Sequence, residues 1–424
     1  MDKTNSLYQA YIDILEEELK PAMGCTEPIA LAFAAATARD LLGTIPSDIT
    51  IEASGSLIKN VKSVYVPHTG HLKGIPAAVA AGIIAGNASL ELEVLRDVTE
   101  DDIKKISEYL NKATFTIKAL DSGHTFDMIM TLKDGDKKSV VRIQDAHTNI
   151  VYKEVDSKVL LDIASSEESI SNESDHTVLS VENIYDFAKT VDLNDIQALI
   201  SRQIEYNMAI AEEGLRGDYG ANIGKLLLRI DPQSVRTKAR AFAAAGSDAR
   251  MNGCELPVVI NSGSGNQGIT TSVPVIIYAR ELNIDEETLY RALVFSNLIT
   301  IHEKTPIGRL SAYCGAVSAG TGAAAGIAFL LGAKRCIIEK TISNAISIIS
   351  GTVCDGAKAS CAAKIAASID SGLLGFVMAE SDKCFESGDG LVGDNVEETI
   401  RNIGALAKDG MTETNKEIIS IMIK

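Results

Sequence analysis

The chain has 424 residues, of which 46% are hydrophobic and 23% are charged, and its formal net charge is −17. This composition indicates a globular protein of about two to three domains and excludes extended disorder, collagen and coiled coil for most of the chain. The acidic balance argues against nucleic acid and anionic membrane surfaces as partners, since both demand a basic patch.

The N-terminal part of the chain predicts helices and short strands. Apolar residues at helical spacing predict a first helix over residues 6–19, ended by a proline. Thr26 is a good N-cap and begins a second predicted helix, for which Gly43 is a suitable end. We then expect short strands over residues 49–53 and 61–66 and a helix rich in small residues over 76–86.

The middle of the chain reads as a sheet. Four runs rich in β-forming residues lie between residues 113 and 153, and the second and third are joined across Asp134, Gly135 and Asp136, a hairpin signal. They predict a small antiparallel sheet. The polar, acidic stretch that follows predicts a linker, and from residue 181 onward the pattern is mostly helical.

These elements predict an α+β fold, with a large, mainly helical body that bears the functional cysteines and a smaller α/β part with an antiparallel sheet. The expected organisation has N-terminal helices that pack on the catalytic body, a small domain, a linker and a helical catalytic domain, over residues 1–45, 46–164, 165–178 and 179–424.

The ends of the chain and its longest apolar run bear on location. The first residues are polar and acidic and lack the apolar segment of a leader peptide, so we expect a cytoplasmic protein. Residues 310–333 carry no charge and are long enough to span a bilayer, but they are rich in Gly, Ser and Thr. A buried helix is the better interpretation, and we expect no membrane association.

Three of the seven cysteines, Cys314, Cys354 and Cys361, lie among glycine and other small residues. Small neighbours let backbone amides approach sulfur and leave room for an inorganic group. Three thiolates can hold three corners of a [4Fe–4S] cluster and leave one iron open as a Lewis acid. Three ordinary buried thiols are the alternative, since free cysteine is among the most buried residue types.

A fourth cysteine, Cys25, immediately precedes the N-cap of the second predicted helix. A helix N-terminus favours the thiolate. Cys25 is therefore a candidate for a ligand, a reactive thiol or a base, and a thiol packed in a loop is the alternative.

The sequence NSGSGNQG, residues 261–268, offers many backbone N–H groups and few bulky side chains. Such a loop resembles an anion-binding nest and would suit the carboxylate of an amino acid. It is not a P-loop, because no Lys-Ser or Lys-Thr follows it. A flexible turn is the alternative.

Loops that place histidine or lysine beside glycine are common positions for general bases and carboxylate-binding groups. Three segments have this character, although a single histidine is more often structural. Their residues are His68, His71 and Lys73; His147; and His302, Glu303, Lys304 and Arg309.

Five motifs in order, PAMGCTEPIALA, VPHTGHLKGIPAA, NSGSGNQGITTSVPV, HEKTPIGRLSAYCGAVSAG and GTVCDGAKASCAAKI, resemble the L-cysteine desulfidase family over almost the whole chain. That family is the stand-alone relative of the iron–sulfur L-serine dehydratases. The likeness to the serine dehydratases themselves is looser, because their last cysteine spacing differs from the six intervening residues found here.

The resemblance implies an oxygen-sensitive [4Fe–4S] enzyme that breaks L-cysteine into sulfide, ammonia and pyruvate. It implies that Cys314, Cys354 and Cys361 hold the cluster and that Cys25 acts as a ligand or in acid/base chemistry. The remaining cysteines match no motif, and we expect them to be packing thiols: Cys254, Cys336 and Cys384.

For this reaction we expect a base to remove the Cα proton while a loop holds the carboxylate. The candidate bases, in order of preference, are Cys25, His68, His71 and Lys304. The expected carboxylate-binding residues are Ser262, Gly263, Ser264, Gly265, Asn266 and Gln267, with Arg309 or Lys304. The partner is a small amino-acid substrate, and a homodimer is possible because Ala/Gly-rich helices pack equally well within one chain or between two.

Three alternatives stay open. The first is an L-serine dehydratase of the same mechanism, since serine and cysteine both eliminate from Cβ. The second is a pyridoxal-phosphate lyase, although no lysine has a convincing phosphate-binding context. The third is a non-enzymatic sensor that binds an amino acid or a metal through the same loops.

Overall fold

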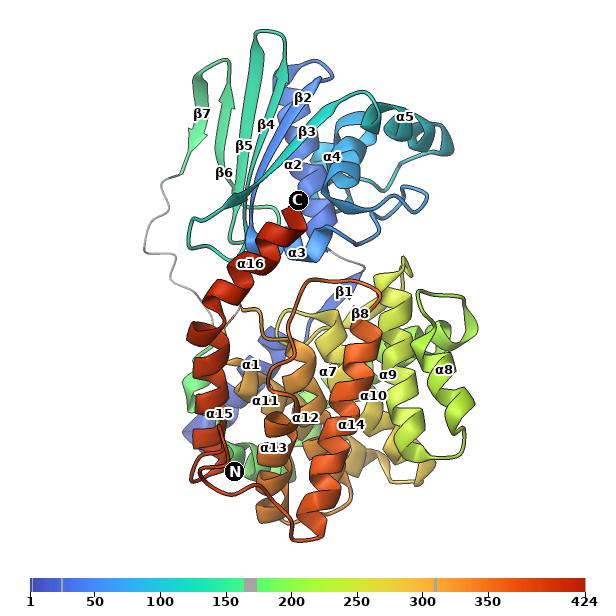
Figure 1. Ribbon diagram of the computed structural model, residues 1–424, viewed down its shortest axis with the longest axis vertical. Helices are drawn as coiled ribbons and strands as arrows, with labels where there is room; N and C mark the ends of the chain where they lie inside the picture. Colours follow the sequence, from blue (N-terminus) through green and yellow to red (C-terminus); the bar gives the residue numbers. More distant parts are fainter. Residues whose placement is uncertain (2, 24–25, 164–173, 309–310, 424) are drawn as a thin grey trace. The chain divides into compact units, whose positions relative to one another are not determined.

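The computed structural model describes residues 1–424 except 2, 24–25, 164–173, 309–310 and 424. The fold is α+β and mostly helical, and the chain forms two compact units (Figure 1). The helical unit comprises Met1–Met23, Asn172–Cys354 and Ala359–Glu413. The sheet unit comprises Gly24–Ser171, Asp355–Lys358 and Thr414–Lys424.

The sheet unit is built on six strands in the order β3-β2-β4-β5-β6-β7. The strands are β2 (Asp48–Ser54), β3 (Thr114–Leu120), β4 (Asp127–Asp134), β5 (Lys137–Gln144), β6 (Ile150–Val155) and β7 (Lys158–Asp162). Its helices are α2 (Thr26–Leu42), α3 (Gly55–Val61), α4 (Gly74–Ala85), the 3-10 turn η1 (Ala88–Glu93) and α5 (Glu100–Leu110).

The sheet is mixed, whereas the sequence predicted an antiparallel one. Strand β2 lies between β3 and β4 and runs parallel to β3. The chain between β2 and β3 passes through α3, α4 and α5, and parallel neighbours require a crossover of this kind. The remaining pairs are antiparallel, and the predicted hairpin is confirmed, with Gly135 at a φ of 58° between β4 and β5.

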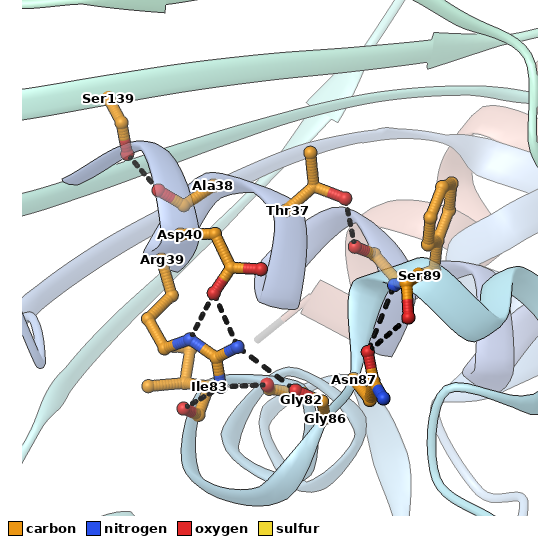
Figure 2. Close-up of polar contacts among 11 residues, drawn as sticks. Thr37, Ala38, Arg39, Asp40, Gly82, Ile83, Gly86, Asn87, Ser89 and Ser139 are labelled. Atoms are coloured by element: carbon orange, nitrogen blue, oxygen red, sulfur yellow. Dashed lines mark hydrogen bonds and ion pairs between the residues drawn. The ribbon is translucent and has the colours of Figure 1, made fainter. Parts of the chain in front are cut away.

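One face of the sheet is buried against α2, and α4 packs on α2. Alternate residues of the central strands, such as Ile49, Ile51 and Met130, are fully buried there, as the period of two in a strand requires. Figure 2 shows how α2 is tied to its neighbours. Arg39 donates to the carbonyls of Gly82, Ile83 and Gly86 at the end of α4, and Ser139 of β5 donates to Ala38 at 2.7 Å.

The helical unit contains most of the remaining elements. They are α1 (Ser6–Glu18), β1 (Pro21–Met23), the 3-10 turn η2 (His176–Val178), α6 (Val181–Thr190), α7 (Leu193–Arg216), α8 (Ile223–Ile230), α9 (Val235–Met251), β8 (Pro257–Val259), α10 (Gly265–Glu281), α11 (Glu286–Lys304), α12 (Gly315–Leu330), α13 (Arg335–Ile349), α14 (Cys361–Glu380), α15 (Val396–Ala405) and the π turn η3 (Leu406–Gly410). The last helix, α16 (Thr412–Ile423), begins in this unit and continues into the sheet unit.

Small residues let the helices of this unit approach closely. A Cβ added to Gly322 of α12 would lie 2.1 Å from Thr300 Oγ1, and one added to Gly326 would lie 2.6 Å from Ser296 Cβ, both on α11. Contacts this short exclude any side chain larger than glycine. The run of glycine and alanine in α12 is therefore explained by packing against α11.

The apolar run at residues 310–333 contains α12, whose residues are almost all buried. One helix of the described chain, α14, is long and apolar enough to cross a membrane by length and composition alone. Just over half of its apolar window is buried in the structure, and core helices meet the same criterion.

Two expectations differ from the structure, and a third lies mostly outside the described residues. Residues 61–66 form no strand; α3 ends at Val61, and only Tyr65 makes an isolated bridge, to Lys73. The expected segment 1–45 is divided, because α1 packs in the core of the helical unit while α2 packs on the sheet. Most of the expected linker, residues 165–173, lies outside the described residues, and η2 follows it.

Candidate functional site

The loop segment at residues 261–268 comprises a tight turn at 261–264, which follows strand β8, and the first turn of helix α10 at 265–268. Ser262 and Gly263 have left-handed backbones, with φ of 48° and 74°, and Asn261 and Ser264 exchange backbone hydrogen bonds of 3.1 and 3.0 Å across the turn. Ser264 caps α10 by accepting from the Gln267 N–H. The first turn of a helix leaves its N–H groups without intrahelical partners and favours anions. Because the Ser264 N–H is already paired within the turn, the anion-binding nest stays a prediction that depends on the first turn of α10.

A close approach fixes α10 against β8. A Cβ on Gly268 would lie 2.0 Å from the carbonyl oxygen of Val259, so only glycine fits. Strand β8 in turn pairs with β1 in antiparallel register, with Met23 opposite Pro257. The N-terminal motif PAM is therefore joined to the strand that leads into the loop.

A buried amide network holds the loop from below. Asn261 is fully buried and donates to Asn297 Oδ1 of α11 at 3.0 Å. Asn297 also exchanges hydrogen bonds of 2.8 and 3.0 Å with Gln203 of α7. One turn along α7, Asn207 accepts from the Val259 N–H at 2.8 Å and donates to the Val259 carbonyl at 3.2 Å. These contacts fix the entry to the loop.

Three of these amides, Gln203, Asn207 and Asn297, were not predicted from the sequence. The signal that could have revealed them is the pair Gln203 and Asn207, one helical turn apart and both fully buried on α7. Buried polar groups need partners, so such a pair predicts a polar neighbour inside the core.

The cysteines Cys314 and Cys354 are held close together by a short backbone bridge. Tyr313 pairs with Val353 in antiparallel fashion, the Cys314 N–H donates to Thr352 at 3.0 Å, and the Cys354 N–H donates to Ala312 at 2.5 Å. The two predicted ligands, Cys314 and Cys354, are therefore each the next residue after one of the two residues paired in this bridge.

The third cysteine, Cys361, is the first residue of α14, and Cys314 is the N-cap of α12. Burial, followed by the negative charge of Cys354 and, more weakly, that of Cys361, raises the pKa of the Cys314 thiol to about 12. The backbone N–H of Ala316 and the charge of Lys364 oppose this rise. The Cys314 thiol therefore lies close enough to those of Cys354 and Cys361 to be affected by their charge.

The loop and the cysteines lie next to each other. A Cβ built on Gly315 would lie 2.6 Å from Gln267 Cδ, so the side chain of the loop residue packs directly on the residue that follows Cys314. Arg250 of α9 approaches the same loop, because a Cβ on Gly265 would lie 2.4 Å from its Nε. The structure therefore brings together two features that the sequence predicted separately, and it adds an arginine that the sequence analysis missed.

Comparison with known proteins supports this grouping. The family model for the serine dehydratase alpha chain matches residues 89–420, which include the loop and all three cysteines. The chain belongs to the serine dehydratase alpha chain family. Similar proteins, each described as a UPF0597 protein, occur in Desulfitobacterium hafniense (52% identical, covering 100% of this chain and 98% of the relative), Lachnoclostridium phytofermentans (48%, covering 98% and 100%) and Treponema denticola (46%, covering 100% of both).

Two predicted bases of this family member lie in the sheet unit. His68 and His71 are exposed, and both have left-handed backbones, with φ of 59° and 71°. The ring of His71 packs edge-on against Tyr65, and Lys73 lies 4.1 Å above the same Tyr65 ring. Left-handed histidines are uncommon, and strain of this kind clusters at functional sites.

The remaining charged candidates have local partners. Lys304 donates to the Gly308 carbonyl at 2.7 Å, and His302 makes a 2.7 Å contact with Glu397. Burial raises the pKa of Glu397, but His302 and other partners lower it further, so the net shift is downward. Cys25 and Arg309 lie outside the described residues.

The expectation of three packing thiols is wrong for two of them. Cys254 is half-buried in the core of the helical unit, whereas Cys336 and Cys384 are exposed. Cys336 is the second residue of α13, and Cys384 follows the end of α14. Both cysteines are exposed because they lie at helix ends, and the hydrophobicity of cysteine alone does not predict that exposure.

One further group among the described residues has the spacing of metal ligands. Single ligand atoms of Glu17, Glu18 and His176 all lie within 4.8 Å of one another. Glu17 already accepts from the Ser174 N–H at 2.8 Å. The group belongs to the helical unit and shares no residue with the loop and cysteines described above.

Proposed function

We propose that this member of the serine dehydratase alpha chain family is an iron–sulfur lyase that converts L-cysteine to sulfide, ammonia and pyruvate. The observation that carries the proposal is the grouping of Cys314, Cys354 and Cys361 beside the loop at residues 262–268. The matching family is described as the serine dehydratase alpha chain, and a dehydratase eliminates a group from its substrate. This supports elimination from an amino acid as the type of reaction.

The three cysteines would hold a [4Fe–4S] cluster. Two features support this: Cys314 and Cys361 lie at the N-termini of α12 and α14, and Cys354 is tied to the segment before Cys314 by the Tyr313–Val353 bridge. The residue after Cys314 is a glycine, which leaves room for an inorganic group. When bound, a cluster with three protein ligands supplies one iron as a Lewis acid for the leaving group.

The protein's own groups would bind and orient the substrate. Backbone amides of the loop and the side chains of Ser264, Asn266 and Gln267 would hold the carboxylate, with Arg250 beside them. A base then removes the Cα proton, its electron pair forms the Cα–Cβ double bond, and the Cβ–S bond breaks to release sulfide. The aminoacrylate tautomerises, and water hydrolyses it to pyruvate and ammonia. Cys25, His68, His71 and Lys304 remain the proposed bases.

L-serine is the second candidate substrate, because the matching family is described by serine dehydratase. The same steps would then release water in place of sulfide. A soft thiol leaving group matches an iron centre better than a hydroxyl does, which favours L-cysteine. We propose a cytoplasmic location for either activity.

The test is anaerobic purification and reconstitution of the full chain, followed by assays of iron, acid-labile sulfide and pyruvate. We expect about four iron atoms per chain and pyruvate formation from L-cysteine, with equimolar sulfide. Pyruvate from L-serine alone would make the protein a serine dehydratase. Iron binding with no pyruvate from either amino acid would contradict the proposed lyase.

A further inference from the structure

Three side chains of the helical unit are more than nine-tenths buried and yet have an unpaired polar atom. They are Glu303, Tyr313 and Gln267, with exposed fractions of 3%, 2% and 8%. Both carboxyl oxygens of Glu303, the Tyr313 hydroxyl and Gln267 Oε1 have no hydrogen-bond partner in the part of the chain that the structure describes. Buried polar groups are nearly always paired, so unpaired ones point to a missing ligand.

The three side chains lie around the start of α12, whose N-cap is Cys314. Tyr313 precedes Cys314 in the chain, and Gln267 packs on Gly315, which follows it. Glu303 reaches the same region through the packing of α11 on α12.

Helices α11 and α12 are antiparallel, with Ser296 against Gly326 and Thr300 against Gly322. Each step of four residues along α11 corresponds to four residues back along α12. Glu303 lies one turn beyond Thr300 and is therefore level with the first turns of α12.

The chemistry of the Glu303 carboxyl indicates which kind of ligand it would bind. A carboxyl with two unpaired oxygens and no cationic partner in the described residues can accept hydrogen bonds from several N–H donors at once. An ammonium group provides three such donors and the opposite charge, and it satisfies a buried carboxylate by direct pairing. The neighbouring loop already offers N–H groups for a carboxylate, so the two sites together match the two charged groups of an α-amino acid.

We propose that Glu303 binds the α-ammonium group of the amino-acid substrate. This inference rests on the proposed function for the identity of the substrate. Tyr313 and Gln267 supply polar contacts around the same ligand. A substrate analogue without the amino group leaves Glu303 unpaired, so the protein selects against it.

The test compares two probes, L-cysteine and 3-mercaptopropionate, which differ by the amino group. Binding of each is measured by calorimetry with the full chain before reconstitution, so that L-cysteine is not consumed, for wild type, Glu303→Gln and the control Glu287→Gln. Glu287 lies on the same helix but is exposed. We expect wild type and the control to bind L-cysteine at least tenfold more tightly than 3-mercaptopropionate.

Glu303→Gln should weaken L-cysteine binding at least tenfold and leave 3-mercaptopropionate within twofold of wild type. Equal weakening of both probes, or no change in either, would overturn the proposal. If Glu303→Gln does not fold, Glu303→Asp decides the matter: its selectivity for L-cysteine should fall but remain above one, and an unchanged ratio would overturn the proposal.

The outcome also separates this inference from the proposed lyase. Wild type that forms no pyruvate, but whose selectivity for the amino group depends on Glu303, would leave the ammonium site intact and refute the lyase. Pyruvate formation together with an unaltered KM for L-cysteine in Glu303→Gln would support the lyase and refute the ammonium site.

Discussion

Asp248 provides a test of how a buried carboxyl changes the free energy of unfolding with pH. It lies on α9 with 1% of its surface exposed, and its Oδ2 accepts from the Gly224 N–H of α8 at 3.4 Å, while Oδ1 has no partner among the described residues. Burial raises its pKa from 3.8 to about 6. The two-unit difference corresponds to about 3 kcal/mol lost from the free energy of unfolding once the group ionises in both states.

The sign follows from proton binding. Between pH 3.8 and 6 the folded state holds the Asp248 proton that the unfolded state has lost. Stability therefore decreases as pH rises through this window and is constant above it. Asn at this position keeps an acceptor oxygen and never ionises, so Asp248→Asn should be stabilising at pH 8, and its advantage over wild type should be about 1–1.5 kcal/mol larger there than at pH 5.

The assay is urea unfolding of wild type and Asp248→Asn at pH 5 and pH 8. The difference between the two proteins cancels the titration of every other group. Asp136→Asn, in the exposed β4–β5 turn, is the control and should change the free energy of unfolding by less than about 0.5 kcal/mol at either pH. A difference for Asp248→Asn that is the same at both pH values would refute the reasoning.

Three further predictions concern the proposed site. Replacing any of the three proposed ligands by serine should remove most iron after reconstitution, whereas Cys336→Ser should retain it, as measured by iron analysis. Asn266→Ala should lower kcat/KM for L-cysteine by about 1–3 kcal/mol without loss of iron, and it should hardly affect cysteamine, which lacks the carboxylate; equal losses on both would assign the loop to the fold. The kcat/KM for L-cysteine should exceed that for L-serine, and a ratio below one would contradict the expected substrate preference.

Local sequence patterns predicted three helices of the N-terminal part and most strands of the sheet, whereas beyond residue 181 they predicted a mostly helical pattern without individual helices. The first helix and the small-residue helix α4 begin within two residues of their expected positions, and the hairpin at Gly135 is where the turn sequence placed it. The strand expected at residues 61–66 failed because a short apolar run has no period of its own. The run became the end of α3 and a loop whose backbone is tied to Lys73.

Strand order was beyond the reach of local patterns. Strand β2 inserts between β3 and β4, which are later in the chain, because the crossover through α3, α4 and α5 returns the chain to the outer edge of β2. Alternation of apolar residues reports which face is buried but not which strand is the neighbour.

The candidate site shows the same division between local and long-range information. Small residues around Cys314 and in the loop indicated close backbone approach, and the contact of Gln267 with Gly315 is an approach of this kind. The sequence could not show that these two segments meet, because their contact depends on the packing of α10 against α12. Glu303 was noted only as part of a charged loop, and its burial on α11 became visible with the helix register.

The buried amides explain how the axial position of α11 is fixed. Asn297 joins Gln203 on α7 to Asn261 at the start of the loop, so a shift of α11 along its axis would break hydrogen bonds on both sides. The same helix carries Glu303 one and a half turns further on. Because unpaired buried amides cost about 1–3 kcal/mol each, the network fixes the axial position of α11 more firmly than apolar packing would. A carboxyl that must meet a ligand beside Cys314 requires such a fixed helix, and the amides provide it from within the core.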